Sequence, residues 1–149
     1  MTVDELEKIL RARDDVVIGT GADEAEVEKA ERSLGVAFPD ALREYLRRFG
    51  HLDLGHFELY GLGSELPKYL QLVPMTLTER TESGCPLPHE LVPLLNNGGG
   101  NLYCIDTCVP EAGRVVLWDH TLGTGQEPEQ LSGSLPEWLA ELLGDLDEG

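Results

Sequence analysis

Three cysteines and four histidines are the side chains of this sequence best suited to nucleophilic or metal chemistry. Cys104 and Cys108 are four positions apart, which along a strand is about 13 Å and too far for joint zinc ligation unless the chain turns sharply. Cys85 lies elsewhere in the sequence, and an odd number of cysteines argues against a disulfide framework. We therefore expect buried free thiols and no disulfide bond.

The histidines suggest a metal site only weakly. The pattern His51-x-Asp53-x-x-His56 resembles a ligand cluster, but it falls in a predicted loop and no fourth ligand is indicated. A nucleophilic cysteine would need a base beside it, and the sequence places no histidine next to a thiol. There is no Ser-His-Asp order and no paired-carboxylate site. We predict no catalytic residue, no metal and no cofactor, and the sequence gives no positive reason for an enzyme.

Three consecutive glycines between Asn96 and Asn101 raise the question of a phosphate-binding loop. The stretch lacks the Lys-Ser/Thr pair of a P-loop, and a strand-like segment follows it where a P-loop would have a helix. Glycine adopts positive φ without a Cβ penalty, so a hairpin turn explains the stretch better.

Three short apolar runs around this turn predict a β-meander, a series of consecutive antiparallel strands. They cover residues 91–95, 102–107 and 114–118. The middle run has Leu102 and Cys104 on one face and Tyr103 and Ile105 on the other, which is typical of a central strand. Pro93 cannot donate a ladder hydrogen bond, so the first run should be an edge strand or contain a bulge.

Capping-box patterns mark the beginnings of three predicted helices. They are Thr2-x-x-Glu5, Asp23-x-x-Glu26 and Ser134-x-x-Glu137. We expect helices over about residues 3–12, 23–35, 39–50, 74–83 and 134–143, with a short strand at 57–60. The helix at 39–50 has the clearest apolar stripe and should belong to the core. Residues 1–21 should be a helix and a loop, and residues 145–149 a frayed acidic tail.

One segment resembles the opening signature of the SUKH superfamily, which includes yeast cell-wall-assembly regulators and many bacterial toxin-immunity proteins. It reads Ala30-Glu31-x-x-Leu34-Gly35-Val36-x-Phe38-Pro39-x-x-Leu42-Arg43-Glu44-Tyr45-Leu46. The later segments fit in order, over about residues 22–143. Asp106 matches an aspartate of the family and should accept backbone N–H groups in the following turn. Trp118 and Trp138 should lie in the core, where a strand face meets a helix face.

Pattern and resemblance together predict a single α+β domain over residues 1–149. It should contain an antiparallel sheet of four or more strands flanked by three to five helices. No apolar run approaches the roughly 20 residues of a membrane helix, and the acidic N-terminus is not a signal peptide. The cysteine usage favours a reducing compartment, so we expect a cytoplasmic protein with no membrane association.

The formal net charge of −17 is the strongest global feature, and it is unevenly distributed. Residues 1–48 carry 12 acidic and 8 basic side chains, whereas residues 49–149 carry 16 acidic and 3 basic ones. A surface this negative repels phosphate backbones and disfavours direct nucleic-acid binding. It would attract a basic protein partner and accelerate their encounter, unless the acidity serves solubility alone.

The resemblance implies a non-enzymatic protein-binding function, most concretely immunity against a polymorphic toxin, for example a nuclease. An acidic surface would occlude the basic groove of such a toxin. The candidate contact residues, chosen from charge and loop position, are Glu111, Asp119, Glu127 and Glu129. A regulatory scaffold of the yeast cell-wall type is the first alternative, and a metal- or thiol-dependent enzyme is the second. The sequence leaves homo-oligomerisation open.

Overall fold

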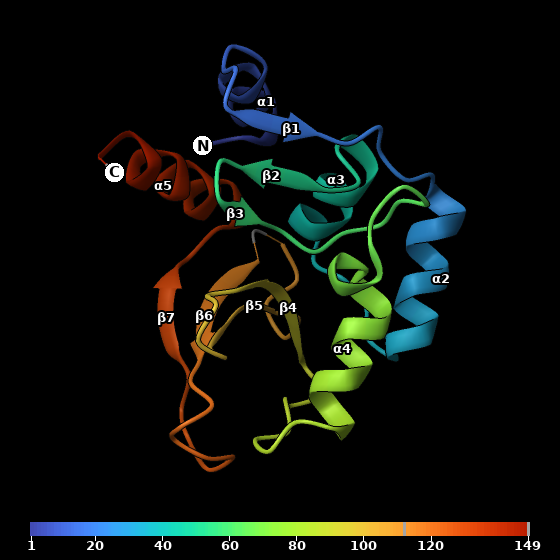
Figure 1. Cartoon of the computed structure of the whole chain (residues 1–149). Coiled ribbons are helices and arrows are strands. Elements are labelled where there is room, and N and C mark those ends of the chain that lie inside the picture. The colour runs from blue at the N-terminus through green and yellow to red at the C-terminus, as the bar shows by residue number, and fades with distance from the viewer. Residues whose placement is uncertain (112, 149) are drawn as a thin grey trace.

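The computed structural model describes residues 1–111 and 113–148, and within them five α-helices accompany two antiparallel sheets. This confirms the predicted α+β class. The helices are α1 (Val3–Arg11), α2 (Glu24–Leu34), α3 (Asp40–Arg48), α4 (Leu72–Thr81) and α5 (Leu135–Glu148), with the 3-10 helix η1 (Lys68–Leu70) before α4. Figure 1 shows these elements in chain order, from the blue N-terminal helix to the red C-terminal one.

The predicted meander forms most of the larger sheet. Its strands are β4 (Leu91–Asn96), β5 (Leu102–Asp106), β6 (Arg114–Trp118) and β7 (Glu129–Ser132), paired in that order. β5 is an inner strand, as its two apolar faces predicted, and β4 is an edge strand. The β4–β5 register shifts between Pro93 and Leu95, so the edge strand also contains the expected irregularity. β7 was not among the predicted strands, and its first residue, Glu129, was assigned to a loop.

The smaller sheet corrects two loop predictions. Its strands are β1 (Val16–Ile18), β2 (Leu52–Leu54) and β3 (Phe57–Glu58), in that order. β1 lies in the supposed N-terminal loop, and β2 lies within the His51–His56 segment. Strands of two or three residues are too short to show a period, so only pairing between distant segments reveals them. The expected strand at 57–60 is shorter, Phe57–Glu58; Leu59 still bonds to Leu52 of β2, but the Tyr60 N–H donates to Leu94 of β4.

Local capping explains why the helices begin and end where they do. The Thr2 hydroxyl accepts the Glu5 N–H at 3.1 Å, and the Asp23 carboxylate accepts the Glu26 N–H at 2.8 Å. Gly35 ends α2 in the left-handed conformation, with φ of 70°. The Arg80 guanidinium donates to the carbonyl of Leu34 at 2.7 Å, which ties α4 to the end of α2.

The C-terminal residues also differ from the prediction. Helix α5 extends to Glu148, so residues 145–148 are helical, and Gly149 lies outside the described residues. Arg13 explains the added helical turn, because its guanidinium binds both Asp15 at 2.7 Å and Asp147 at 2.8 Å. Leu146 packs over Gly55, where a Cβ would lie 2.7 Å from the leucine side chain.

The larger sheet separates two apolar clusters. The main core holds Ile105 and Val115 from one sheet face, together with the buried faces of α1, α2, α3 and α5. The predicted core helix α3 is confirmed, since Leu42, Leu46 and the following Phe49 are fully buried. The smaller cluster lies on the other face and contains Cys85, Leu87, Leu91, Leu102, Cys104, Val116 and Trp118.

The two tryptophans are buried as predicted but do not meet. Trp138 on α5 packs against Tyr103 in the main core, with ring centroids 5.7 Å apart. Trp118 lies in the smaller cluster, where its indole N–H donates to the Cys85 carbonyl at 3.3 Å. The strand face that carries Trp118 points away from α5, because side chains alternate across the sheet.

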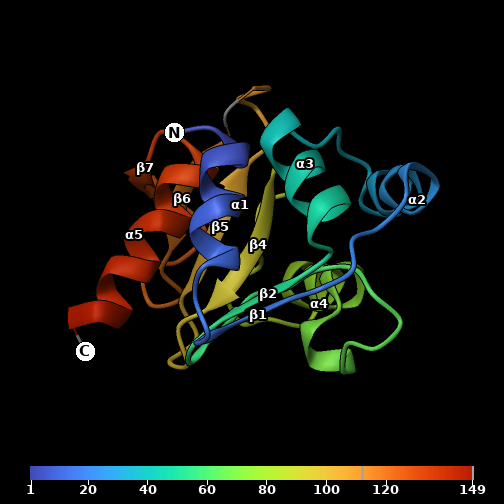
Figure 2. The ribbon, with the colours of Figure 1, turned by 90° about the horizontal axis from the view of Figure 1, so that it is seen from above.

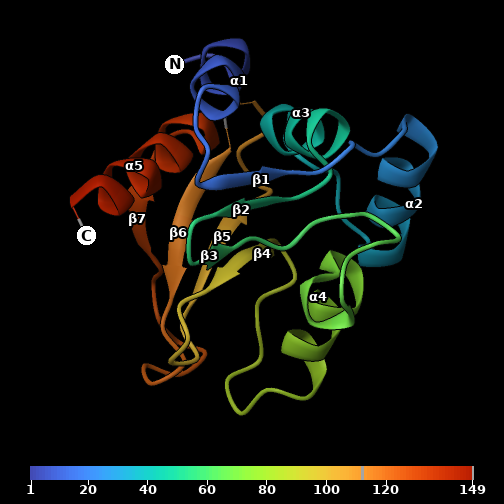
Figure 3. The same ribbon diagram turned by 45° about the horizontal axis from the view of Figure 1, so that its top comes forward.

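The helices flank the sheets in two groups. Seen from above in Figure 2, α5, α1 and α3 lie side by side, while α2 and α4 lie farther along, beyond β4. Figure 3 shows the β1–β3 sheet lying across the molecule, with β3 facing the β4 end of the larger sheet. Among the described residues, no helix combines the length and apolar character needed to cross a bilayer.

Candidate partner-binding groove

The four acidic residues predicted as partner contacts do not form one patch. Glu111 follows β5, whereas Asp119 and Glu127 lie in the connection between β6 and β7, and Glu129 begins β7. The β5–β6 and β6–β7 connections are at opposite ends of the antiparallel sheet, which separates Glu111 from the other three. The structure therefore brings together three of the four predicted residues.

Of these three, Asp119 is used mainly to build its own loop. Its carboxylate accepts the Thr121 N–H at 2.9 Å and the Thr121 hydroxyl at 2.6 Å, and these bonds lower its pKa. The Gln126 side chain donates to the Asp119 carbonyl at 2.7 Å. Glu127 and Glu129 are exposed and form no ion pair with any side chain in the described ranges. They remain available for contact.

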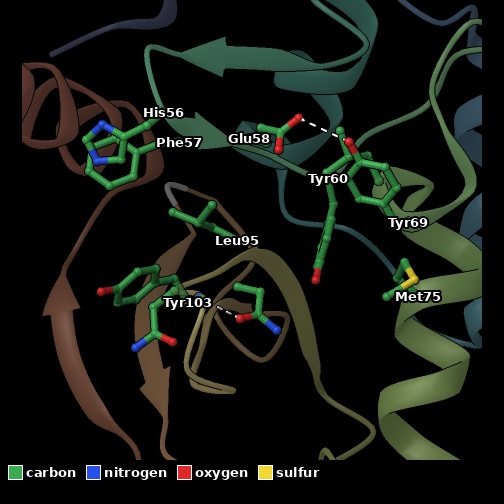
Figure 4. Close-up of a pocket in the computed structure, with 12 residues that line it drawn as sticks. His56, Phe57, Glu58, Tyr60, Tyr69, Met75, Leu95 and Tyr103 are labelled. Atoms are coloured by element: carbon green, nitrogen blue, oxygen red, sulfur yellow. Dashed lines mark hydrogen bonds between the residues drawn. The ribbon is translucent and has the colours of Figure 1, made fainter.

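A groove between the two sheets is a stronger candidate than this loop. Its cavity has a volume of about 560 Å³ and opens beside β3, η1, α4 and the β4–β5 turn. Figure 4 shows side chains from these elements pointing into it. The lining is His56, Phe57, Glu58, Tyr60, Tyr69, Leu70, Met75, Leu95, Asn96, Asn97, Gly98 and Tyr103.

Backbone hydrogen bonds fix the walls of the groove. The Tyr60 N–H donates to the Leu94 carbonyl at 2.8 Å, which joins the chain after β3 to the irregular part of β4. The Gly61 N–H donates to the Leu70 carbonyl at 3.0 Å, and the Gly61 carbonyl accepts the Leu72 N–H at 2.9 Å. These bonds hold η1 and the start of α4 against the sheet junction, and so position the Tyr69 and Met75 side chains.

The β4–β5 turn forms a firm rim. Asn96 accepts the Gly98 N–H at 2.8 Å, and Asn97 accepts the Gly99 N–H at 2.8 Å and the Asn101 N–H at 3.1 Å. Gly98 and Gly100 have φ of 91° and 101°, which side-chain-bearing residues rarely adopt. The glycine run is therefore a turn, as the sequence predicted, and it supplies one wall of the groove.

The lining is typical of a surface that binds another protein. Tyrosine and methionine are enriched at protein interfaces, where each buries a large apolar surface and few polar groups lose contact with water. Tyr69 is 57% exposed, and its hydroxyl donates to the Glu58 carboxylate at 3.5 Å. Tyr60 is buried, and burial raises its pKa to about 12, so its hydroxyl stays protonated at neutral pH. The groove can therefore present neutral aromatic groups around one carboxylate.

The residues of the His51-x-Asp53-x-x-His56 pattern have separate structural roles in the fold. His51 is buried beside Gly19 and Gly61, with its Nε2 3.2 Å from Glu65. His56 lies in the β2–β3 turn and packs on Phe57, with ring centroids 4.1 Å apart. Across residues 1–111 and 113–148, no three His, Cys, Asp or Glu side chains are arranged to hold a metal ion.

The three cysteines are free thiols, and their burial differs from the prediction in one case. Cys85 and Cys104 are buried, whereas Cys108 is exposed in the turn after β5. Burial raises the pKa of the Cys104 thiol well above its usual range, which keeps it protonated. Cys104 thus behaves as an apolar core residue.

Asp106 has the role that the sequence predicted. Its carboxylate accepts the Cys108 N–H at 2.9 Å, inside the turn that follows β5. It also pairs with the Arg114 guanidinium at 2.6 Å across the β5–β6 ladder. Because the aspartate is buried, this pair fixes the turn and is not a surface for partners.

The sequence did not identify the groove, because its lining comes from five segments between positions 56 and 103. A density of aromatic and methionine residues between His56 and Met75 was the available signal. Each residue taken alone is compatible with a core position. Only the fold shows that Tyr69 is exposed and that Tyr103 and Leu95 face the same cavity.

Comparisons with known proteins agree with this architecture. A family model, SUKH_5, described as SMI1-KNR4 cell-wall, matches residues 2–144. A search of curated proteins found no match. A crystal structure of a protein from Pseudomonas syringae pv. tomato is similar with a TM-score of 0.70 and 21% sequence identity. That match covers 93% of this chain and 96% of the other, and at this identity it shows a shared fold.

Proposed function

The chain belongs to the SUKH (SMI1-KNR4) family, and from this premise we propose that it is a non-catalytic module that binds a basic protein partner. The most concrete form of this proposal is immunity, in which the chain binds a polymorphic toxin, such as a nuclease, and occludes its active site. The groove beside β3 is the observation that carries the proposal, because it offers an exposed tyrosine, a methionine and other aromatic side chains in one cavity.

The charge distribution supports a basic partner. Residues 49–149 contain only three basic side chains, Lys68, Arg80 and Arg114. Arg114 pairs with Asp106, and Arg80 donates to the Leu34 and His89 carbonyls, so among the described residues of this region only Lys68 and Arg80 offset the exposed acids. A nuclease carries basic residues to bind phosphates, and an acidic protein can compete for that surface. Long-range attraction would also accelerate the encounter.

A regulatory scaffold is the second candidate function. The description of the matching family, SMI1-KNR4 cell-wall, favours it, because its wording connects the family with the cell wall. A scaffold would use the same groove and the same acidic surface toward a partner that is not a toxin. The two proposals therefore differ in the biological partner and share the binding chemistry.

The test co-expresses the chain with the toxin domain encoded beside its gene and measures survival of the host cells. We expect protection by the wild-type chain and reduced protection by Tyr69→Ala, which removes an exposed side chain of the groove. Leu77→Ala is the matched control, since Leu77 is 41% exposed and does not line the groove. Killing that is unaffected by the wild-type chain, or the lack of a neighbouring toxin gene, would favour the scaffold.

A further inference from the structure

We propose that the groove recognises an arginine side chain of the partner, with Glu58 binding the guanidinium and Tyr69 stacking on it. The inference rests on the proposed protein-binding function and specifies the chemistry of the partner. Glu58 is the only aspartate or glutamate in the described lining, and that lining contains no lysine or arginine.

Strand pairing places a second carboxylate beside Glu58. In the β2–β3 ladder Asp53 is directly opposite Glu58, so both side chains point to the same face of the smaller sheet. The next pair along the ladder is Leu52 and Leu59, and it is a hydrogen-bonded pair because the Leu59 N–H donates to the Leu52 carbonyl at 3.0 Å. Asp53 and Glu58 then form a non-hydrogen-bonded pair, the type in which the Cα atoms are only about 4.5 Å apart. Like charges in this arrangement repel.

No cation within residues 1–111 and 113–148 offsets this repulsion. Neither Asp53 nor Glu58 is in an ion pair there, and the buried Asp53 Oδ1 has no hydrogen-bond partner. Lys68 is adjacent to Tyr69 in sequence, but it forms no ion pair within those residues and does not line the groove. The site has an unbalanced negative charge that an arriving cation would neutralise.

The aromatic surroundings favour arginine over lysine. The Tyr69 hydroxyl lies 3.5 Å from the Glu58 carboxylate, so a group bound to that carboxylate also lies beside the tyrosine. A guanidinium is planar, binds a carboxylate through two N–H groups and stacks on an aromatic face. A lysine ammonium is a strongly hydrated point charge. It has neither the paired N–H groups that bind both carboxylate oxygens nor a planar face that stacks on an aromatic ring. β3 is also an edge strand, so an extended segment can approach it.

The experiment titrates the isotope-labelled protein with a blocked Gly-Gly-Arg-Gly-Gly peptide and follows backbone amide shifts by NMR. Two further peptides separate the effect of charge from that of shape. The lysine peptide keeps the positive charge without the planar group, and the citrulline peptide keeps a similar planar group without the charge. Physiological ionic strength limits diffuse attraction to the acidic surface, because screening acts over about 8 Å. We expect saturable shifts at Glu58, Tyr69 and Asn97, with the arginine peptide binding several-fold more tightly than lysine and citrulline binding least.

Three variants test the assignment. Glu58→Gln removes the charge at constant shape and should weaken arginine binding about five- to tenfold. Tyr69→Ala should weaken it several-fold, and Tyr69→Phe should retain most of the affinity because the ring remains. Glu141→Gln is the matched control, since Glu141 is also exposed, forms no ion pair in the described ranges and lies on α5 outside the groove. It should bind like the wild type.

Equal weakening by Glu58→Gln and Glu141→Gln, shifts confined to the β6–β7 connection, or no saturable binding would overturn the inference. These outcomes are separable from a failure of the proposed function. If the toxin partner binds and is neutralised while Glu58→Gln has no effect on either assay, only the arginine assignment fails. If the arginine peptide binds at the groove while the toxin is not neutralised, the immunity proposal fails and the recognition chemistry stands.

Discussion

Truncating Leu46 tests the packing of helix α3, on which the position of the smaller sheet depends. The Leu46 side chain is fully buried in the main core, together with Leu42 on the same helix and Leu52 on β2. Leu46→Ala removes three buried carbon atoms and leaves a cavity that its neighbours refill only in part. The free energy of unfolding should therefore fall by about 2–5 kcal/mol.

The magnitude is large compared with the whole stability of a domain of this size. Domains are stable by about 5–15 kcal/mol, so the variant should lose a substantial share of that margin. For a chain of about 150 residues, each kcal/mol lowers the Tm by roughly 2–4 °C. Urea denaturation followed by circular dichroism gives the midpoint and the m-value, and only the midpoint should change.

Leu77→Ala is the matched control, because the same side chain is truncated on a helix where it is 41% exposed. It should cost less than about 1 kcal/mol, since little apolar area leaves the core. If the two variants shift the midpoint equally, α3 is not the core helix described above. A change in the m-value would indicate an altered denatured state and would also contradict the packing argument.

Four further predictions concern charge. Glu58→Gln should raise the free energy of unfolding by about 0.2–1 kcal/mol, because it removes the repulsion from its cross-strand carboxylate; a loss of stability in urea denaturation would contradict this. Burial raises the pKa of Glu79 in the folded state above its value in the unfolded chain. The stability that this shift contributes is fully present below the pKa of the unfolded state and is lost as the pH rises through the pKa of the folded state. Glu79→Gln should therefore be more stable than wild type near neutral pH but not in acid, and parallel pH profiles would refute it. Arg13→Gln should speed hydrogen exchange in the last turn of α5, because its bond to the helix end is lost; unchanged exchange would show that packing alone orders this turn. Reversing Glu127 and Glu129 to lysine should slow association with a basic partner and reduce its salt dependence, as stopped-flow kinetics would show. A rate that is independent of salt would mean that the acidity has no part in steering.

Elements with a local signal could be predicted from the sequence. Helices α1, α2 and α5 begin after cap residues whose side-chain oxygens accept the expected N–H groups, as at Thr2, Asp23 and Ser134. The meander was predictable because its turns are rich in glycine and its strands have apolar faces. In each case residues close in sequence make the interactions that fix the element.

Elements that depend on distant partners were missed. β1 exists because Val17 pairs with Asp53, more than thirty positions away, and three residues carry no period of their own. The same limit applies to the candidate site. Charge and loop position favoured Glu111 and Asp119, yet the first lies at the other end of the sheet and the second is engaged with Thr121. Glu58 could be recognised only once the sheets were placed.

The irregular part of β4 has a consequence for aggregation. An apolar strand at a sheet edge is a template on which strands of other molecules can add. In β4, Pro93 has no N–H to offer, and the Leu94 carbonyl is already bonded to Tyr60. The edge thus lacks a donor and an acceptor that intermolecular sheet growth would require. The fold protects its most hydrophobic edge from self-association while the groove beside it stays open to another protein.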